Sequence, residues 1–180
     1  MSFLTEDKEN IAPLYGKADI EFVKGEGSYL FDSKGDKYLD FVAGIAVNAL
    51  GHQNLGIKNA IMEQLEHFNH VSNLYPNYPQ IKLAKKLRQV TGFDKVFFCN
   101  SGAEANEGCI KFARKFFSKQ GENRQKIVTF VNSFHGRTYA TLSATGQPAL
   151  REGFGDMPLH FVHVKWNDVE ALKAEVNGET

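Results

Sequence analysis

The stretch that decides the fold is FCNSGAEANE, residues 98–107, in which an apolar strand runs within two or three residues into a helix. Ser101 and Glu104 have the spacing of a capping box: the hydroxyl accepts from the Glu104 amide, and the carboxylate returns to the Ser101 amide. Gly102 and Ala103 then open the helix, where unpaired N–H groups and the helix dipole attract phosphate. The sequence predicts a phosphate site at Ser101, Gly102 and Ala103, although a capped helix without a ligand explains the motif equally well.

Short apolar strands alternate with helices on both sides of this stretch. The pattern predicts strands over 95–99, 126–131 and 160–164, and helices over 102–119 and from about Asp168. Such alternation is typical of an α/β fold with a mostly parallel sheet covered by helices on both faces. Three strands leave long unprotected edges, so we expect this sheet to be incomplete at Thr180.

The N-terminal part has a different pattern. Three short strands, expected to be antiparallel, are separated by turns at Gly25-Glu26-Gly27 and at residues 33–36; the strands span 20–24, 28–32 and 37–41. Apolar residues at helical spacing predict helices over 59–68 and 80–90. We therefore expect an N-terminal antiparallel segment over residues 1–50, followed by the first part of a larger domain over residues 51–180.

A second chemically informative stretch, NSFHGRT at 132–138, directly follows the strand predicted at 126–131. We expect it to meet the first stretch, because the carboxyl ends of parallel strands share one edge of a sheet. The Phe134 ring could stack on a flat heteroaromatic ring, His135 could line the same pocket, and the Arg137 guanidinium could hold a carboxylate through two hydrogen bonds. Core packing for Phe134, a local hydrogen bond for His135 and a structural ion pair for Arg137 are the alternatives.

Composition excludes several classes of partner. The 180 residues contain 21 Lys and Arg against 21 Asp and Glu, so no net positive charge favours nucleic acid or an anionic membrane. The most apolar segment, residues 41–50, is half of the roughly 20 residues needed to span a bilayer. The N-terminus lacks the pattern of a secretory signal. We expect a cytoplasmic protein.

Metal and disulfide chemistry are also disfavoured. Cys99 and Cys109 are too few and too widely spaced for a disulfide framework or a zinc site. His67 and His70 lie three residues apart, but no Cys or carboxylate completes a ligand set at a diagnostic spacing. His160 and His163 are expected on opposite faces of their strand. We therefore expect no metal.

Several motifs together carry a family resemblance. The chain resembles the class III, pyridoxal-phosphate-dependent aminotransferases from about residue 15 to residue 164, and especially their acetylornithine-specific members. The motifs that carry the resemblance are NSGAEANE at 100–107, FHGRT at 134–138, YLDF at 38–41, GIAVNALGH at 44–52 and SNLY at 72–75.

The resemblance implies a fold-type-I architecture and a role for each site residue. In that family the amides at Gly102 and Ala103 bind the phosphate of pyridoxal 5′-phosphate, Phe134 stacks on its pyridine ring, and Arg137 receives the substrate α-carboxylate. The implied reaction moves the terminal amino group of N2-acetyl-L-ornithine to 2-oxoglutarate, giving L-glutamate, in arginine biosynthesis. The resemblance also implies a homodimer.

The chain departs from the family in three places. A His-Pro pair that is common in the family is missing near Gln53-Asn54-Leu55. The family usually has Ala-Ala where this chain has Gly108-Cys109. No lysine matches the Schiff-base site, which in the family lies beyond the equivalent of Thr180, so we assign no catalytic residue and expect the 180-residue chain alone to be inactive. Alternatives are another amino donor (ornithine, succinylornithine or 4-aminobutyrate), a related decarboxylase or aminomutase, or a non-catalytic cofactor-binding remnant.

Overall fold

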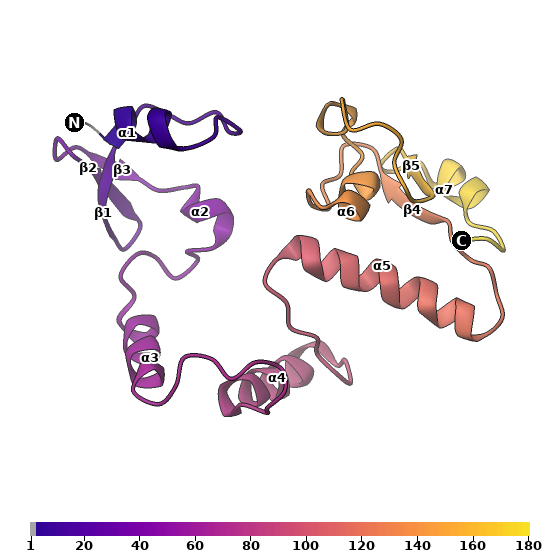
Figure 1. Cartoon of the computed structure of the whole chain (residues 1–180), viewed down its shortest axis with the longest axis horizontal. Helices are drawn as coiled ribbons and strands as arrows, with labels where there is room; N and C mark the ends of the chain where they lie inside the picture. The colour runs from indigo at the N-terminus through magenta and orange to yellow at the C-terminus, as the bar shows by residue number, and fades with distance from the viewer. Residues whose placement is uncertain (1–2) are drawn as a thin grey trace. The chain divides into compact units, whose positions relative to one another are not determined.

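The computed structural model describes residues 3–180, which fall into two compact units, one ending at Ile81 and one beginning at Lys82 (Figure 1). The first unit contains the antiparallel strands and the second contains the parallel ones. The domain division expected after residue 50 stays a prediction.

The first unit is built on a three-stranded antiparallel sheet in the order β1-β2-β3. Its strands are β1 (Phe22–Glu26), β2 (Tyr29–Asp32) and β3 (Lys37–Leu39). The three expected strands are confirmed, but the first turn lies later than predicted, because Glu26 pairs with Tyr29 and leaves only Gly27 and Ser28 to connect them. Gly27 has φ +56°, the left-handed conformation that a two-residue hairpin favours and that glycine adopts without steric cost.

The N-terminal half of the chain contains the helices α1 (Phe3–Asn10), α2 (Ala43–Ala46), α3 (Leu55–Leu65) and α4 (Tyr78–Thr91), which crosses the boundary between the units. No helix was expected at α1 or α2, and α3 and α4 begin earlier than the helices predicted over 59–68 and 80–90. The Asn54 side chain accepts from the Ile57 amide at 3.2 Å and caps α3, and Asn77 accepts from the Gln80 amide at 2.9 Å at the start of α4. Capping side chains therefore set both starts.

A side-chain pair closes the loop that carries α2. The Asp40 carboxylate lies 2.8 Å from Nε2 of His52 and accepts from the Ala43 amide, also at 2.8 Å. These hydrogen bonds hold the pKa of Asp40 below its usual value, because they favour the charged carboxylate, and the hydrogen bond from His52 has the largest effect. The backbone amides and carbonyls of His52 and Gly27 also bond to each other, so the loop is fixed at its base.

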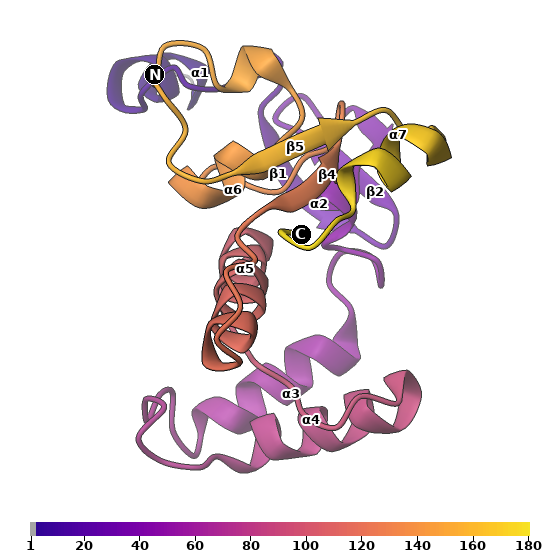
Figure 2. The same ribbon diagram turned by 90° about the vertical axis from the view of Figure 1, so that its right-hand side faces the viewer.

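The second unit follows the predicted α/β order. Its elements are α5 (Gly102–Lys119), β4 (Ile127–Phe130), α6 (Tyr139–Ala144), the 3-10 turn η1 (Pro148–Leu150), β5 (Phe161–Val164) and α7 (Val169–Glu175). β4 and β5 pair in parallel, from Ile127 opposite Phe161 to Phe130 opposite Val164, and Figure 2 shows them side by side. The predicted parallel pairing is confirmed.

Two expectations for this unit were wrong. Residues 95–99 are not a strand, because no other strand within residues 3–180 hydrogen-bonds to them. Residues 139–144 form α6 where no helix was expected. Thr141 and Ser143 are poor helix formers, but α6 contacts both α5 and β5, and this burial outweighs their low propensity.

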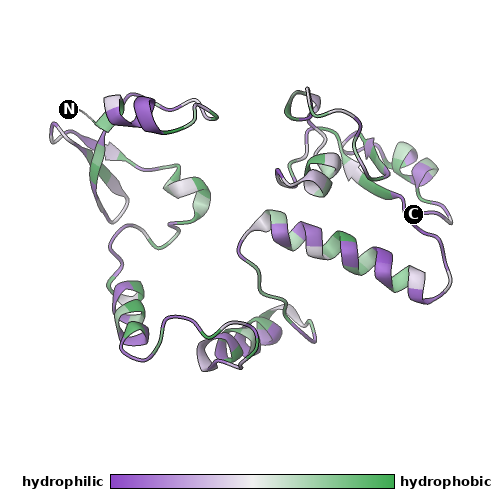
Figure 3. Ribbon diagram, in the orientation of Figure 1, coloured by the Kyte–Doolittle hydropathy of each residue, from purple (hydrophilic) through white to green (hydrophobic). Residues whose placement is uncertain are grey.

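The core of the second unit is small and contains hydroxyl groups as well as apolar side chains. Leu142, Ala144 and Val164 are buried together with three threonines and a serine: Thr129, Thr141, Ser143 and Thr145. The Thr129 hydroxyl donates to the Ala144 carbonyl at 2.8 Å, so its burial leaves no unpaired donor. Along α5, hydrophobic and hydrophilic residues alternate (Figure 3).

Candidate functional site

The start of α5 is fixed as the capping box predicted, with one correction. Ser101 is extended, with φ −152° and ψ 162°, and its hydroxyl accepts from the Glu104 amide at 3.2 Å. The Glu104 carboxylate does not return to the Ser101 amide as expected; it accepts from the Asn100 main-chain amide at 2.6 Å and from the Asn100 side-chain amide at 3.1 Å. Asn100 competes successfully because it offers two donors to one carboxylate.

The first turn of α5 leaves room for an anion. Gly102 is exposed, and a Cβ atom built on it would meet no other atom within 4 Å. The N–H groups of Gly102 and Ala103 have no carbonyl partner within the helix, because they belong to its first turn. These amides, together with the dipole of an 18-residue helix, are suited to bind phosphate.

The loop over residues 132–138 lies directly against this turn. The side-chain amide of Asn106 donates to the carbonyl of His135 at 2.7 Å, and the Thr138 hydroxyl donates to the Glu107 carboxylate at 2.5 Å. The structure therefore joins the two stretches that the sequence singled out, although the strand expected before the first stretch, over residues 95–99, is not formed.

Two of the predicted site side chains on this loop are open to solvent. Phe134 is 56% exposed and Arg137 is also exposed, whereas His135 is half-buried. The His135 amide donates to the Thr145 hydroxyl at 3.0 Å. Arg137 borders a cavity of about 140 Å³, whose other lining residues are Tyr139, Leu142, Leu150 and Phe154. The roles predicted for these three side chains remain predictions.

Sequence reasoning missed the residues that hold this loop in place. Asn106 lies three positions after Ala103 and hence on the same side of α5, a spacing that could have indicated its role. No local signal marks Thr145, which is completely buried after the end of α6. Its role depends on a contact with His135, ten residues earlier in the chain.

The histidine and cysteine candidates do not form a metal site. Within residues 3–180 no three His, Cys, Asp or Glu side chains are placed to hold a metal ion, and both cysteines are free thiols. His163 instead lies with Nε2 3.2 Å from the Ala144 carbonyl. Burial lowers the pKa of His163, and the nearby Arg151 charge lowers it further, so the neutral ring is favoured. None of the helices within residues 3–180 is long and apolar enough to cross a membrane.

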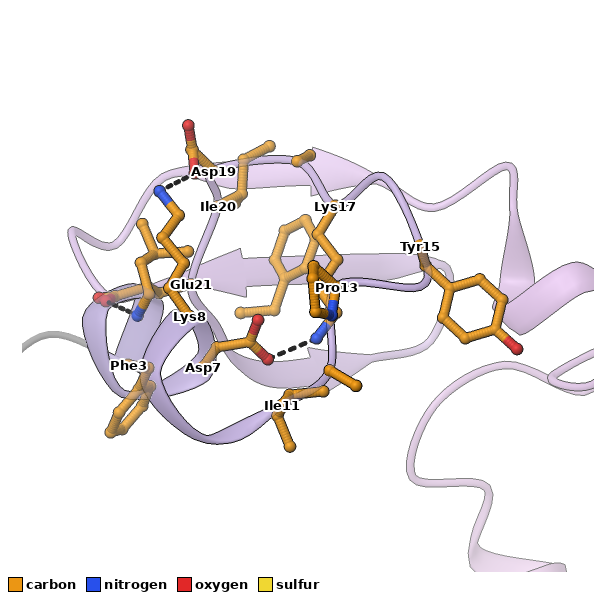
Figure 4. A pocket seen from close by; sticks show the side chains of 14 residues that line it. Phe3, Asp7, Lys8, Ile11, Pro13, Tyr15, Lys17, Asp19, Ile20 and Glu21 are labelled. Carbon is orange, nitrogen blue, oxygen red and sulfur yellow. Dashed lines mark hydrogen bonds and ion pairs between the residues drawn. The ribbon is translucent and has the colours of Figure 1, made fainter.

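A separate cavity of about 440 Å³ lies in the first unit, among α1, the following loop and β1 (Figure 4). Four of its charged side chains form two ion pairs: Lys17 with Asp7 at 2.5 Å and Lys8 with Asp19 at 3.3 Å. The carboxylate of Glu21, which also lines the cavity, accepts from the Leu4 amide at 3.2 Å and from the Ser33 hydroxyl at 3.0 Å. Because these charged groups already have partners, we place the candidate functional site in the second unit.

Curated relatives match almost the whole chain. An acetylornithine aminotransferase from Methanocaldococcus jannaschii is 48% identical over 175 residues, covering 97% of this chain and 44% of the relative. An acetylornithine aminotransferase from Caldanaerobacter subterraneus subsp. tengcongensis is 50% identical over 177 residues, covering 98% of this chain and 45% of the relative. The chain thus spans a little under half the length of these relatives.

Solved structures share the fold. The ornithine aminotransferase from Toxoplasma gondii superposes with a TM-score of 0.89 at 26% identity, over 96% of this chain and 41% of that one. The omega transaminase from Pseudomonas jessenii in complex with PMP superposes with a TM-score of 0.82 at 30% identity. The match covers 91% of this chain and 39% of the transaminase chain. The predicted fold-type-I aminotransferase architecture is confirmed. The family described as Aminotransferase class-III matches residues 11–180, and the chain belongs to that family.

Proposed function

We propose that this chain serves a pyridoxal-phosphate-dependent aminotransferase that moves the terminal amino group of N2-acetyl-L-ornithine to 2-oxoglutarate, in arginine biosynthesis. The observation that carries the proposal is the packing of the 132–138 loop onto the start of α5. It gives one compact unit phosphate-binding amides, an exposed aromatic ring and a guanidinium group. The names of the two curated relatives support acetylornithine as the amino donor.

The residues at this site fit the cofactor. The space at Gly102 is compatible with a phosphate, because a Cβ atom added to this residue would meet no other atom within 4 Å. Ser101 keeps these amides at the helix start through its cap. The exposed Phe134 ring offers a face for stacking on the pyridine ring, and the neighbouring His135 could line the same site. When bound, pyridoxal phosphate supplies the aldehyde and the electron-accepting ring on which amino-group transfer depends.

Arg137 would orient the substrate. Its planar guanidinium can hold a carboxylate through two parallel hydrogen bonds, which fixes direction as well as position. With the α-carboxylate of an ornithine skeleton held there, the distal amine is the one directed toward the cofactor. The same guanidinium can receive a carboxylate of 2-oxoglutarate in the second half of the reaction.

We assign no catalytic lysine within residues 1–180. Lys126 is buried, but its ammonium lies 3.3 Å from the Glu175 carboxylate, so this lysine joins β4 to α7. We therefore propose that the 180-residue chain by itself does not transaminate. Borohydride reduction after exposure to pyridoxal phosphate, followed by peptide mapping, tests this: a single stoichiometrically labelled lysine together with turnover would overturn the assignment.

The function is tested on the full protein that carries this chain. Purified enzyme is supplied with 2-oxoglutarate and, in turn, acetylornithine, ornithine, succinylornithine or 4-aminobutyrate, and glutamate formation is measured. The proposal expects the highest kcat/KM with acetylornithine, and preference for another amine would reassign the substrate. We further propose a cytoplasmic homodimer, which sedimentation of the purified protein and cell fractionation would check.

A further inference from the structure

We propose that Asn106 and Thr145 are positioning residues, which hold the main chain of His135 from two sides and so set Phe134 and Arg137 against the phosphate-binding turn of α5. This inference rests on the proposed function, because it assigns these two residues a role in the same cofactor site. Neither residue needs to touch cofactor or substrate.

Thr145 holds the amide of His135. Its side chain is completely buried, and its hydroxyl oxygen accepts from the His135 N–H at 3.0 Å. A hydroxyl has one proton to donate, and of the two carbonyl oxygens within reach that of Thr141, at 2.9 Å, is nearer than that of Gly136, at 3.4 Å; donation to either leaves lone pairs for the His135 amide. The hydroxyl therefore links the loop to the last turn of α6 with matched donors and acceptors.

Asn106 binds the main-chain carbonyl of His135. Its side-chain amide donates to the His135 carbonyl at 2.7 Å, and its main chain belongs to α5. Both main-chain polar groups of His135 are thus bound by side chains from separate parts of the unit. With N–H and C=O both held, neither peptide plane flanking His135 can turn without breaking a hydrogen bond.

The position of His135 makes this arrangement relevant to the site. Phe134 precedes it directly and Arg137 follows two residues later, so both side chains depart from main chain next to the held segment. Displacements of about 1 Å in groups that orient a substrate can cost about a hundredfold in rate. Asn106 and Thr145 therefore control where the aromatic ring and the guanidinium lie relative to Gly102 and Ala103.

The test uses the full protein and two pairs of variants. Thr145→Val keeps the shape of the side chain and removes the hydroxyl, whereas Thr145→Ser keeps the hydroxyl. Asn106→Ala removes the donor and leaves a good helix former on α5, and Cys109→Ala, an exposed position on the same helix, is its control. Hydrogen exchange of peptides covering residues 132–138 is measured without cofactor, and the dissociation constant of pyridoxal phosphate is measured by titration.

We expect Thr145→Val and Asn106→Ala to accelerate exchange over residues 132–138 and to weaken pyridoxal phosphate binding about tenfold, which is about 1.4 kcal/mol. Thr145→Ser and Cys109→Ala should stay within about twofold of the parent. If Thr145→Val fails to fold, the exchange rate and the cofactor affinity of Asn106→Ala decide whether the inference holds. Wild-type exchange and affinity in Asn106→Ala would overturn the inference, whereas a parent protein that binds no pyridoxal phosphate would overturn the proposed function instead.

Discussion

Gly136 lies so close to Ala103 that a Cβ atom added to the glycine would be 2.7 Å from the Cβ of the alanine. The same added atom would lie 2.6 Å from the Thr141 hydroxyl oxygen. Gly136 also has φ +131°, a backbone conformation that other residues rarely adopt. The loop and the start of α5 can thus meet only because this position has no side chain.

Gly136→Ala should therefore lower the free energy of unfolding by about 1–3 kcal/mol, because the added methyl group overpacks the contact. Urea denaturation measures the change. Gly153→Ala is the matched control: Gly153 also has positive φ, at +84°, but an added Cβ would meet nothing within 4 Å. If the two variants lost equal free energy of unfolding, backbone strain and not the contact with Ala103 would explain why position 136 requires glycine.

Gly102→Pro should weaken binding of pyridoxal phosphate about tenfold while leaving the fold intact. Proline is well tolerated at the first position of a helix, and Ser101 already has the extended conformation that a following proline requires. The substitution therefore removes one phosphate-binding amide with little other change. Gly102→Ala, which keeps the amide, is the control, and equal cofactor titrations for the two variants would exclude this N–H as a phosphate donor.

Phe134→Ala should weaken cofactor retention, since aromatic stacking contributes about 0.5–1.5 kcal/mol beyond the burial of surface. The ring is more than half exposed, so its removal should cost little stability. Phe93→Ala, at a position that is 73% exposed, is the control for loss of a surface phenylalanine. Dialysis of the holoenzyme followed by absorbance measures retention, and equal retention in both variants would place the cofactor ring elsewhere.

Arg137→Lys keeps the charge but loses the second parallel hydrogen bond to a carboxylate. In the full protein we expect kcat/KM for acetylornithine to fall at least tenfold, or about 1.4 kcal/mol, with a smaller effect on cofactor binding. Single-turnover kinetics of both half-reactions provide the measurement. Parent-like rates in both would remove Arg137 from the substrate site.

Stability at low pH should depend on Asp40. Its pKa is lowered in the folded state, chiefly by the hydrogen bond from His52, so the charged carboxylate stabilises the fold above the unfolded pKa of about 3.9. That contribution to stability is lost as the pH falls through the lower pKa that Asp40 has in the folded state. Asp40→Asn should thus be destabilised relative to the parent at pH 6, and the difference should shrink below about pH 4.

Chemical denaturation of the parent and Asp40→Asn at several pH values checks this expectation. His52→Gln, which keeps a side-chain donor but cannot carry charge, separates the hydrogen bond from the ionic attraction. A difference between parent and Asp40→Asn that stays constant from pH 6 to pH 3 would show that ionisation of Asp40 does not contribute to stability.

The features that the sequence determined by itself depend on residues a few positions apart. The cap of α5 by Ser101 follows from a spacing of three residues, and the hairpin between β1 and β2 from a glycine that accepts positive φ. The parallel pairing of β4 and β5 was predictable because short apolar strands alternating with helices have few other ways to bury both faces. Such signals are local, so they survive in the sequence alone.

Only the tertiary structure decided which residues far apart in the sequence contact each other. Asn106 and His135 are 29 residues apart, and no periodicity relates them. α6 is helical because of what buries it, whereas residues 95–99, as apolar as β4, are not a strand because no neighbouring strand pairs with them. A hydrogen bond between distant residues forms only where two surfaces meet, and that meeting is a property of the packed fold. The same packing brings His135 and Gly136 against α5.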